Sequence, residues 1–260
     1  MKELWRLILN PPADGVWNMG VDCALLDSAA HGAAAPVLRL YGWDKPTLSI
    51  GYAQKPSTDI ARAFLENEKI PLVRRPTGGR AILHWDELTY AVVIPSNSRF
   101  FGSLPEIYAT IAVPLRAALT SLGLALDAGG GAVGARNNPC CFATRLGHEI
   151  SVNGKKVVGS AQRRLKTAAL QHGSIVLSLD AERYANCLNF TDEAKRDAAL
   201  ALLGGINDFA ARKVTRDELA TAVTDAFAQT LGLEFERGGL TEEEERIAAQ
   251  RGMAVVTPYR

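Results

Sequence analysis

The middle of the chain, from Pro71 to Pro95, has the pattern of short β-strands joined by tight turns. The runs "PLVRRP", "AILHW" and "LTYAVVIP" are rich in β-branched and aromatic residues, and the turn "TGGR" separates the first two. Further runs of this kind are "ELWRLIL", "PVLRLYGW", "TLSIGYAQ" and "TAALQHGSIVLSLD". In "HEISVNGKKVVGSAQ", Asn153-Gly154 suits the type I′ turn of a hairpin. The chain must therefore build a sheet.

Helical segments alternate with these strands. Apolar residues recur at helical spacing in "DGVWNMGVDCALLDSAA", and "STDIARAFLENEK" opens with a Ser/Thr/Asp cap. We expect a long amphipathic helix in "SLPEIYATIAVPLRAALTSLG", kinked or broken at Pro114, then a short strand "LALDA". The remainder, Ala181 to Arg260, is expected to be mostly helical. The predicted fold class is α/β (α+β), a mixed sheet flanked by helices, in one domain of residues 1–260 with a small helical C-terminal part from about 181.

Composition excludes several classes of protein. The 260 residues are 47% hydrophobic with a net charge of +1, which argues against nucleic-acid binding through bulk positive potential. Four cysteines make neither a disulfide framework nor a zinc pattern, so we expect reduced thiols and no metal. No window approaches the ~18 apolar residues that span a bilayer, and the N-terminal apolar run is too short for a signal peptide. We expect a cytoplasmic protein without a membrane partner.

The glycine turn is the first candidate for chemistry. Two glycines between strands let a backbone approach an acyl chain, a carbonyl or a phosphate closely. Charged and titratable side chains surround it: Arg74, Arg75, Arg80, His84, Asp86 and Glu87. The pattern is neither a Walker A loop nor a G-x-G-x-x-G fingerprint. A hairpin with solvated arginines explains these residues equally well.

The adjacent thiols of Cys140 and Cys141 are the second candidate. A free cysteine is usually a small core residue, which suits Cys23 and Cys187 in helical segments. The interpretation as core residues suits Cys140 and Cys141 poorly, because a glycine-rich loop, two asparagines and a proline precede them. A cation lowers the pKa of a thiol and makes it a nucleophile. Strand alternation lets only one of the "KK" pair at 155 and 156 point inward to supply that cation.

Polar residues within two strands are the third candidate. "GSAQ" and "QHGS" place Gly159 and Gly173 where strands approach a ligand or each other, with Ser160, Gln162, Gln171 and His172 beside them. A histidine in a strand is more often structural than catalytic, so this pattern is weak alone.

Taken together, these segments resemble the biotin/lipoate A/B protein ligase family, and within it the LipM-type octanoyltransferases. The resemblance runs through "NMGVDCALL", "VLRLYGWDKPTLSIGYAQ", "RRPTGGRAILHWDELTYAVV", "NGKKVVGSAQRR" and "LQHGSIVLSLD". It implies a fold related to biotin ligases and class II tRNA synthetases. Two chemistries share that fold: ATP-dependent ligation through an acyl-adenylate, and acyl transfer through a cysteine thioester.

Two features favour the transferases. Cys141 directly precedes Phe142, the "CF" context of their nucleophile, and the glycine turn reads Gly78-Gly79-Arg80-Ala81 where ligases usually read "GGGA". The resemblance implies catalytic Cys141 and Lys156, since the lysine that opens K-x-x-G-S-A falls at 156. It implies substrate contacts from Arg75, Gly78, Gly79, His84, Tyr90, Gly159, Ser160, Ala161, His172 and Gly173. Attack by Cys140 stays open as an alternative.

The resemblance also implies the partners. We expect octanoyl transfer from acyl carrier protein to a lysine of a lipoyl domain or the glycine cleavage H protein, without a cofactor. Acyl carrier proteins are acidic, and the basic cluster of Lys155, Lys156, Arg163, Arg164 and Lys166 could steer them, although an ordinary solvated rim explains the same residues. The alternatives are an ATP- and Mg²⁺-dependent lipoate ligase, and a non-catalytic adaptor that binds carrier domains.

Overall fold

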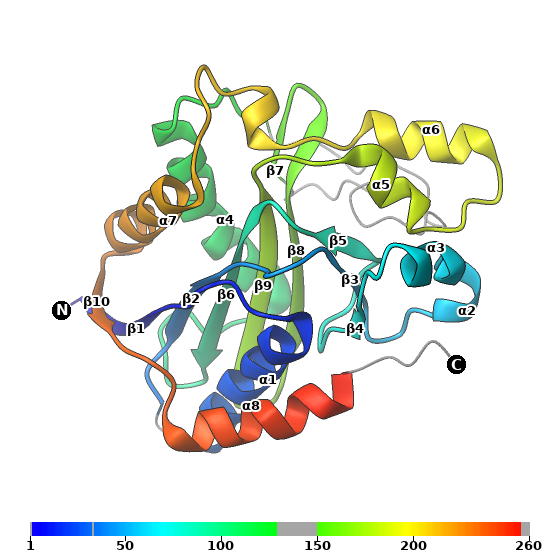
Figure 1. The fold of residues 1–260 in the computed structure, drawn as a ribbon. Helices are drawn as coiled ribbons and strands as arrows, with labels where there is room; N and C mark the ends of the chain where they lie inside the picture. The colour runs from blue at the N-terminus through cyan, green and yellow to red at the C-terminus, as the bar shows by residue number, and fades with distance from the viewer. Residues whose placement is uncertain (1, 33, 129–149, 256–260) are drawn as a thin grey trace.

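Two β-sheets form the framework of the molecule (Figure 1). The computed structural model describes residues 2–32, 34–128 and 150–255. The main sheet has seven strands in the order β10-β1-β2-β6-β9-β8-β7. Their bounds are β1 Glu3–Leu9, β2 Val37–Tyr41, β6 Glu87–Pro95, β7 Ile150–Val152, β8 Lys155–Arg164, β9 Ala168–Val176 and β10 Leu233–Arg237. The small sheet, in the order β4-β3-β5, comprises β3 Thr47–Ile50, β4 Leu72–Arg74 and β5 Ile82–His84.

Helices cover both faces of the main sheet. They are α1 Gly15–His31, α2 Pro56–Asp59, α3 Arg62–Asn67, α4 Leu104–Ser121, α5 Ala181–Asn186, α6 Glu193–Ala201, α7 Arg216–Leu231 and α8 Glu242–Val255, with a 3₁₀ turn at Ile206–Asp208. The pair α4 and α7 packs on one face of the main sheet, and α1 with α8 lies against the other. The small sheet and the helices α3, α5 and α6 enclose a third apolar cluster.

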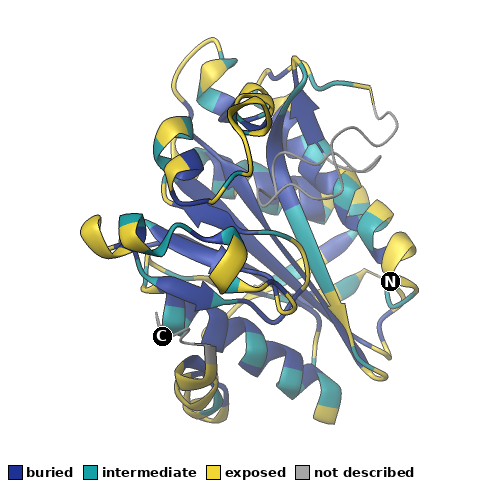
Figure 2. Cartoon of the chain, turned by 90° about the vertical axis from the view of Figure 1, so that its right-hand side faces the viewer, coloured by how far each residue is buried: buried dark blue, intermediate teal, exposed yellow. Residues whose placement is uncertain are grey.

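The central strands are buried on both faces, as Figure 2 shows. Every residue of β6 and β9 is buried, so polar side chains on these strands must find partners inside the protein. The pairs β1–β10 and β1–β2 are parallel, and the remaining pairs of the main sheet are antiparallel. The sheet is therefore mixed, as predicted, and its buried polar groups mark the places that need explanation.

The predicted hairpin between β7 and β8 is confirmed. Asn153 and Gly154 have φ values of 48° and 78°, and a type I′ turn requires positive φ at both central residues. The antiparallel register of β7 and β8 follows from this turn. Two predicted elements, the helix over 57–69 and the strand over 124–128, differ in the structure.

The helix expected over 57–69 is interrupted. Ile60 is extended, with φ −116° and ψ 128°, and bridges Leu188, so α2 ends before it and α3 begins after it. Lys55 precedes α2 without a side-chain cap, and the expected Ser/Thr/Asp cap lies inside α2. Tertiary pairing of Ile60 outweighs the local helical preference.

The long helix α4 continues through Pro114, so of the kink or break expected there the break does not occur. Proline removes one backbone hydrogen bond from a helix. Pro114 is buried in α4, which packs against α7, and this packing holds the helix together around the lost bond. Ser103 and Glu106 form a capping box that starts α4.

The strand expected over 124–128 is not formed. In this segment the Asp127 amide donates to the Ser151 carbonyl of β7 at 2.8 Å. The C-terminal part is mostly helical as predicted, and within it β10 joins the edge of the main sheet parallel to β1. In the described ranges, no helix is long and apolar enough to cross a membrane.

Candidate active site

A narrow cavity lies between the main sheet and the small sheet. It is lined by residues of helix α1 and of strands β2, β5, β6, β8 and β9, and by Arg75, which directly follows β4. The lining residues are Met19, Tyr41, Arg75, Ile82, His84, Thr89, Gly159, Ser160, Ala161, His172, Gly173 and Ser174. The cavity volume is about 20 Å³, room for roughly one water molecule. The structure thus brings seven of the expected substrate contacts to one cavity: Arg75, His84, Gly159, Ser160, Ala161, His172 and Gly173.

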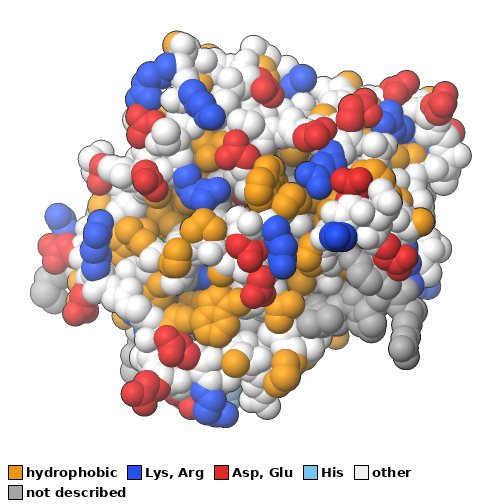
Figure 3. Space-filling model, viewed as in Figure 1, with side chains coloured by type: hydrophobic (Ala, Val, Ile, Leu, Met, Phe, Trp, Pro, Cys, Tyr) orange, Lys and Arg blue, Asp and Glu red, His pale blue; other side chains and the backbone are white. Residues whose placement is uncertain are grey.

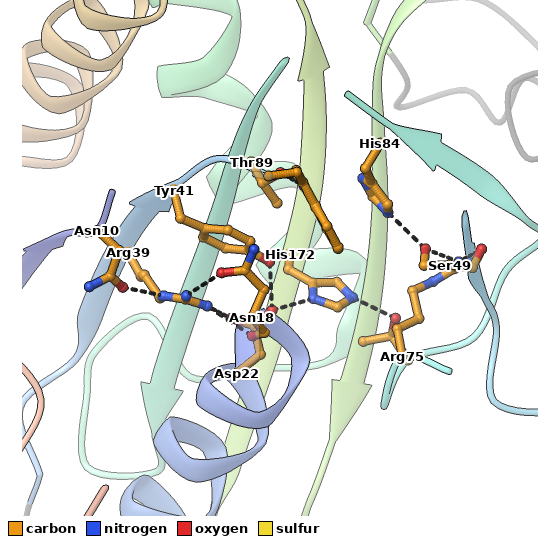
Figure 4. A network of polar contacts seen from close by, with 12 residues as sticks. Asn10, Asn18, Asp22, Arg39, Tyr41, Ser49, Arg75, His84, Thr89 and His172 are labelled. Atoms are coloured by element: carbon orange, nitrogen blue, oxygen red, sulfur yellow. Dashed lines mark hydrogen bonds and ion pairs between the residues drawn. The ribbon is translucent and has the colours of Figure 1, made fainter. Parts of the chain in front are cut away.

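A buried ion pair stands beside this cavity (Figure 4). The Asp22 carboxylate on α1 accepts hydrogen bonds from Arg39 Nη1 at 2.7 Å and from the Tyr41 hydroxyl at 3.0 Å. Asn18, one helical turn before Asp22, accepts two more bonds from the same guanidinium. Asp22, Arg39 and Asn18 are fully buried. A buried charge is tolerated when it is paired and hydrogen-bonded, and both ions here meet that condition.

This network reaches the glycine turn through His172. His172 Nδ1 lies 2.7 Å from Asp22 Oδ2, and His172 Nε2 lies 2.7 Å from Thr77 Oγ1. Because the carboxylate only accepts, Nδ1 carries the proton, and in the neutral ring Nε2 accepts from the Thr77 hydroxyl. We call this chain of contacts the Asp22 relay; it runs from α1 through β9 to the first residue of the turn.

A second chain of contacts reaches the same turn. Glu87 Oε1 lies 2.8 Å from His84 Nδ1, and His84 Nε2 lies 2.8 Å from the Ser49 hydroxyl. Arg75 Nη1 donates to Ser49 Oγ at 3.1 Å, and Nη2 of the same guanidinium donates to the Gly78 and Arg80 carbonyls at 2.8 and 2.7 Å. We call this the Glu87 relay. The two relays hold the glycine turn from both sides.

Both carboxylates remain ionised in their buried positions. Burial raises the pKa of Asp22, but the hydrogen bond from His172 and the charge of Arg39 outweigh it and lower the pKa below 3.8. For Glu87, burial likewise raises the pKa, and the charge and hydrogen bond of His84 with the bond from Ser174 lower it below 4.5. Trp43 stacks on His84 with ring centroids 4.0 Å apart and shields this pair from water.

The glycine turn packs closely against the small sheet. Gly79 has φ 92°, in the region that favours glycine, and a Cβ on Gly51 would lie 2.1 Å from the Gly79 carbonyl oxygen. A Cβ on Gly78 would instead meet none of the described residues within 4 Å. The fold therefore requires glycine at 79, whereas no described residue crowds position 78.

Tyr90 lies on the opposite face of the main sheet. It stands beside Gly173 on β9, which stands beside Ser160 on β8. A Cβ on Gly173 would lie 2.7 Å from the Tyr90 ring, so glycine there lets the ring cross β9. The Tyr90 hydroxyl lies 2.6 Å from Ser160 Oγ and accepts from Gln171 Nε2 at 3.0 Å. Tyr90 thus belongs to a neutral network packed toward α4.

Lys156 and Lys155 differ as the alternation argument predicts. Lys156 is fully buried on β8, whereas Lys155 is half-exposed. The basic cluster expected to steer an acidic partner must therefore be reduced, because Lys156 is not on the surface. Arg163 and Arg164 also bind backbone carbonyls, of Pro76 at 3.3 Å and of Gly102 at 2.9 Å.

The cysteines fall into two groups. Cys140 and Cys141 lie outside the described residues, together with the glycine-rich loop before them. Burial raises the pKa of both Cys23 and Cys187 to about 12. Neither thiol ionises near neutral pH, in agreement with their interpretation as core residues.

Several functional-site residues escaped the sequence analysis. Asp22, Arg39, Ser49 and Thr77 hold the candidate site, yet none was predicted as part of it, and Glu87 was noted only for its place in the sequence. One signal was available: Asn18 and Asp22 are four residues apart on a helix whose neighbours are apolar, so both point into the interior. The partners of these groups depend on strand pairing and were not visible.

Comparison with known proteins places the chain in a family. Residues 14–228 match the model of the lipoyl protein ligase A/B catalytic domain, and the chain belongs to this family. It is 38% identical to a protein of Kyrpidia tusciae named octanoyltransferase LipM, over 95% of this chain and 94% of that one.

Solved structures of the family share the fold. A lipoate-protein ligase A bound with ATP superposes with a TM-score of 0.80 and 25% identity, covering 97% of this chain and 95% of the other. A bi-partite lipoate protein ligase from Thermoplasma acidophilum, solved in a study with its E2 lipoyl domain, gives a TM-score of 0.79 and 26% identity, with 96% and 92% covered. The predicted family and fold are confirmed.

Proposed function

We propose that this protein transfers an octanoyl group from acyl carrier protein to a lysine of a lipoyl carrier domain, through a thioester on Cys141. The observation that carries the proposal is the similarity in sequence. Proteins named octanoyltransferase LipM are 34–38% identical over more than nine-tenths of both chains, whereas the solved lipoate ligases are 25–26% identical. Few cysteines and no disulfide framework suit a reaction in the cytoplasm.

The reaction has two steps. The Cys141 thiolate attacks the octanoyl thioester, the bond from the carbonyl carbon to the phosphopantetheine sulfur breaks, and the released thiolate takes a proton. The neutral amine of the target lysine then attacks the Cys141 thioester and gives up a proton, the bond from the carbonyl carbon to the Cys141 sulfur breaks, an amide forms, and the Cys141 thiolate leaves. Thioester exchange is nearly thermoneutral and amide formation is downhill, so the sequence of steps needs no ATP.

Lys156 is proposed to stabilise the Cys141 thiolate and to move protons in both steps. Its side chain is fully buried on β8, so its amine lies inside the protein rather than in bulk solvent. Backbone amides near Gly78, Gly79 and Gly159 are proposed to donate to the oxyanion, and donors of this kind are worth about 3–4 kcal/mol each. The two relays give the glycine turn the rigidity that such donors require.

The proposed partners are acyl carrier protein as donor and a lipoyl domain or the glycine cleavage H protein as acceptor. Figure 3 shows Lys and Arg interspersed with Asp and Glu on the face it views, without a field of one sign. Partner recognition on that face would therefore depend on local contacts more than on overall charge.

A lipoate ligase that uses ATP and Mg²⁺ is the second candidate. Its support is the shared fold with a lipoate-protein ligase A bound with ATP. It predicts a strict ATP requirement with free lipoate or octanoate.

One assay separates the candidates. The protein is incubated with octanoyl-acyl carrier protein and an apo lipoyl domain in the absence of ATP. We expect octanoylation of the domain, abolished in Cys141→Ala and retained in the matched Cys187→Ala. Activity only with ATP and free acid would establish the ligase, and inactivity under both conditions would leave the adaptor.

A further inference from the structure

Strand β8 contains a β-bulge beside Lys156. Val158 stands opposite Ile150 of β7, and Lys156 stands opposite Ser151. Between these two pairs, β8 moves on by two residues and β7 by only one, so Val157 is the extra residue of the bulge. Such a bulge changes the side to which the following side chains point, and bulges often redirect a side chain next to a functional site.

The register shows which side chains share a face. Val158 pairs with both Ile150 and Ile175, and all three belong to the core under α4. Ser151 follows Ile150 and so points to the opposite face, which is that of the cavity. Lys156 is the direct partner of Ser151 and shares its face.

The same register places the cavity on this face. Gly159 pairs with Ser174, and Ala161 pairs with His172, and all four line the cavity. In a regular strand, Lys156 and Gly159, three residues apart, would point to opposite faces. The bulge brings them to one face and leaves Lys155, opposite Val152, on the other.

Ser151 is an unusual residue at this position. Its side chain is 1% exposed, and its Oγ has no hydrogen-bond partner among the residues that the structure describes. A buried hydroxyl without a partner destabilises a fold, and alanine would fill almost the same space without that cost. Folding alone does not explain a serine here.

We infer that Ser151 is a positioning residue, whose hydroxyl binds the Lys156 amine during acyl transfer. Direct cross-strand partners have Cβ atoms about 4.5–5.5 Å apart, so a lysine stem can bring Nζ to the serine Oγ. A hydroxyl accepts from an ammonium and donates to a neutral amine. Ser151 can therefore hold the amine in both protonation states, which a proton-moving lysine visits in turn. The inference rests on the proposed function.

The test compares Ser151→Ala with Ser151→Thr, which keeps the hydroxyl on a strand-favouring side chain. In the ATP-free assay we expect Ser151→Ala to lower kcat about tenfold, the effect of one hydrogen bond to a charged group. KM for both carrier proteins should stay unchanged, and the melting temperature should stay equal or rise. Ser151→Thr should restore most of kcat.

Other outcomes overturn the inference. A wild-type kcat in Ser151→Ala would show that the hydroxyl has no part in transfer. A lowered melting temperature together with a lowered kcat would show a structural role. If the wild type itself transfers no octanoyl group, the proposed function fails and the inference with it, whereas an active wild type beside a fully active Ser151→Ala refutes the inference alone.

Discussion

The two faces of β9 carry polar networks of different kinds. On the face toward α1 and the small sheet, His172 and Ser174 meet the buried carboxylates of Asp22 and Glu87. On the face toward α4, Gln171 meets the hydroxyl of Tyr90, without any charge. One strand thus separates an ionised network from a neutral one.

The ionised and the neutral network have different roles. Each carboxylate on the charged face has at least three hydrogen-bond partners, and each network continues to the glycine turn. Buried ion pairs rarely add stability compared with apolar residues, so their position beside the cavity argues for a role in the site. The neutral network connects β6, β9 and β8, and its main effect is to hold the sheet together.

The largest effect is expected for Asp22→Ala on the charged face. It leaves the fully buried Arg39 without its carboxylate, and loss of one partner from a buried pair costs about 3–5 kcal/mol. The free energy of unfolding, from urea titration, checks this. The matched control is Asp27→Ala on the same helix, which breaks an exposed pair with Arg251 and should cost less than about 1 kcal/mol. Equal losses of unfolding free energy in Asp22→Ala and Asp27→Ala would show that the buried pair of Asp22 and Arg39 matters no more than an exposed one.

Gly173→Ala should cause the second-largest loss of stability, because the Tyr90 ring of the neutral network packs against β9 at Gly173. A Cβ there would lie 2.4 Å from the Gly159 carbonyl oxygen and 2.7 Å from the Tyr90 ring. Overpacking of this kind costs about 1–3 kcal/mol. Gly78→Ala is the control, since its Cβ would meet none of the residues that the structure describes within 4 Å. If the Gly173→Ala protein is as stable as the Gly78→Ala protein, the Tyr90 ring does not pack against β9 at Gly173.

Acid should weaken the charged face selectively. The pKa values of Asp22 and Glu87 are lowered in the folded protein, so the unfolded chain binds protons first as the pH falls. Their stabilising contribution is present above about pH 4.5 and is lost progressively below it. Urea titrations between neutral pH and pH 3 measure this slope. Glu87→Gln should flatten it, and an unchanged slope would show that Glu87 does not titrate as described.

The smallest effect is expected for Tyr90→Phe. Burial raises the pKa of Tyr90 to about 12, so its hydroxyl is neutral throughout the acid range. Removal of one neutral hydroxyl should cost about 1 kcal/mol and leave the acid dependence of stability unchanged. Urea titrations of this variant at neutral and acid pH check both statements. A steeper acid slope in Tyr90→Phe would show that the two faces are coupled through β9.

The strands of this fold could be predicted from sequence because their signals are local. Period-two runs and Asn153-Gly154 fix strands and a turn without reference to distant residues. The break at Ile60 and the strand Leu233–Arg237 escaped prediction, because each depends on a partner far along the chain, Leu188 and β1 respectively. Local preference cannot reveal such pairings.

The sequence predicted some residues of the candidate site but not the partners that hold them. Motif residues such as His84 and His172 could be selected from their neighbours in sequence. Their carboxylate partners are positioned by tertiary structure, and Asp22 lies 150 residues from His172. Strand alternation predicted that only one of Lys155 and Lys156 points inward, but the face that Lys156 occupies depends on a bulge that the sequence does not reveal.

Intact-protein mass spectrometry after incubation with octanoyl-acyl carrier protein alone tests covalent transfer through Cys141. We expect one octanoyl adduct on the wild type, none on Cys141→Ala, and loss of the adduct when an apo lipoyl domain is added. An adduct that persists in Cys141→Ala, or octanoyl transfer by a wild type that never carries one, would contradict covalent transfer through Cys141.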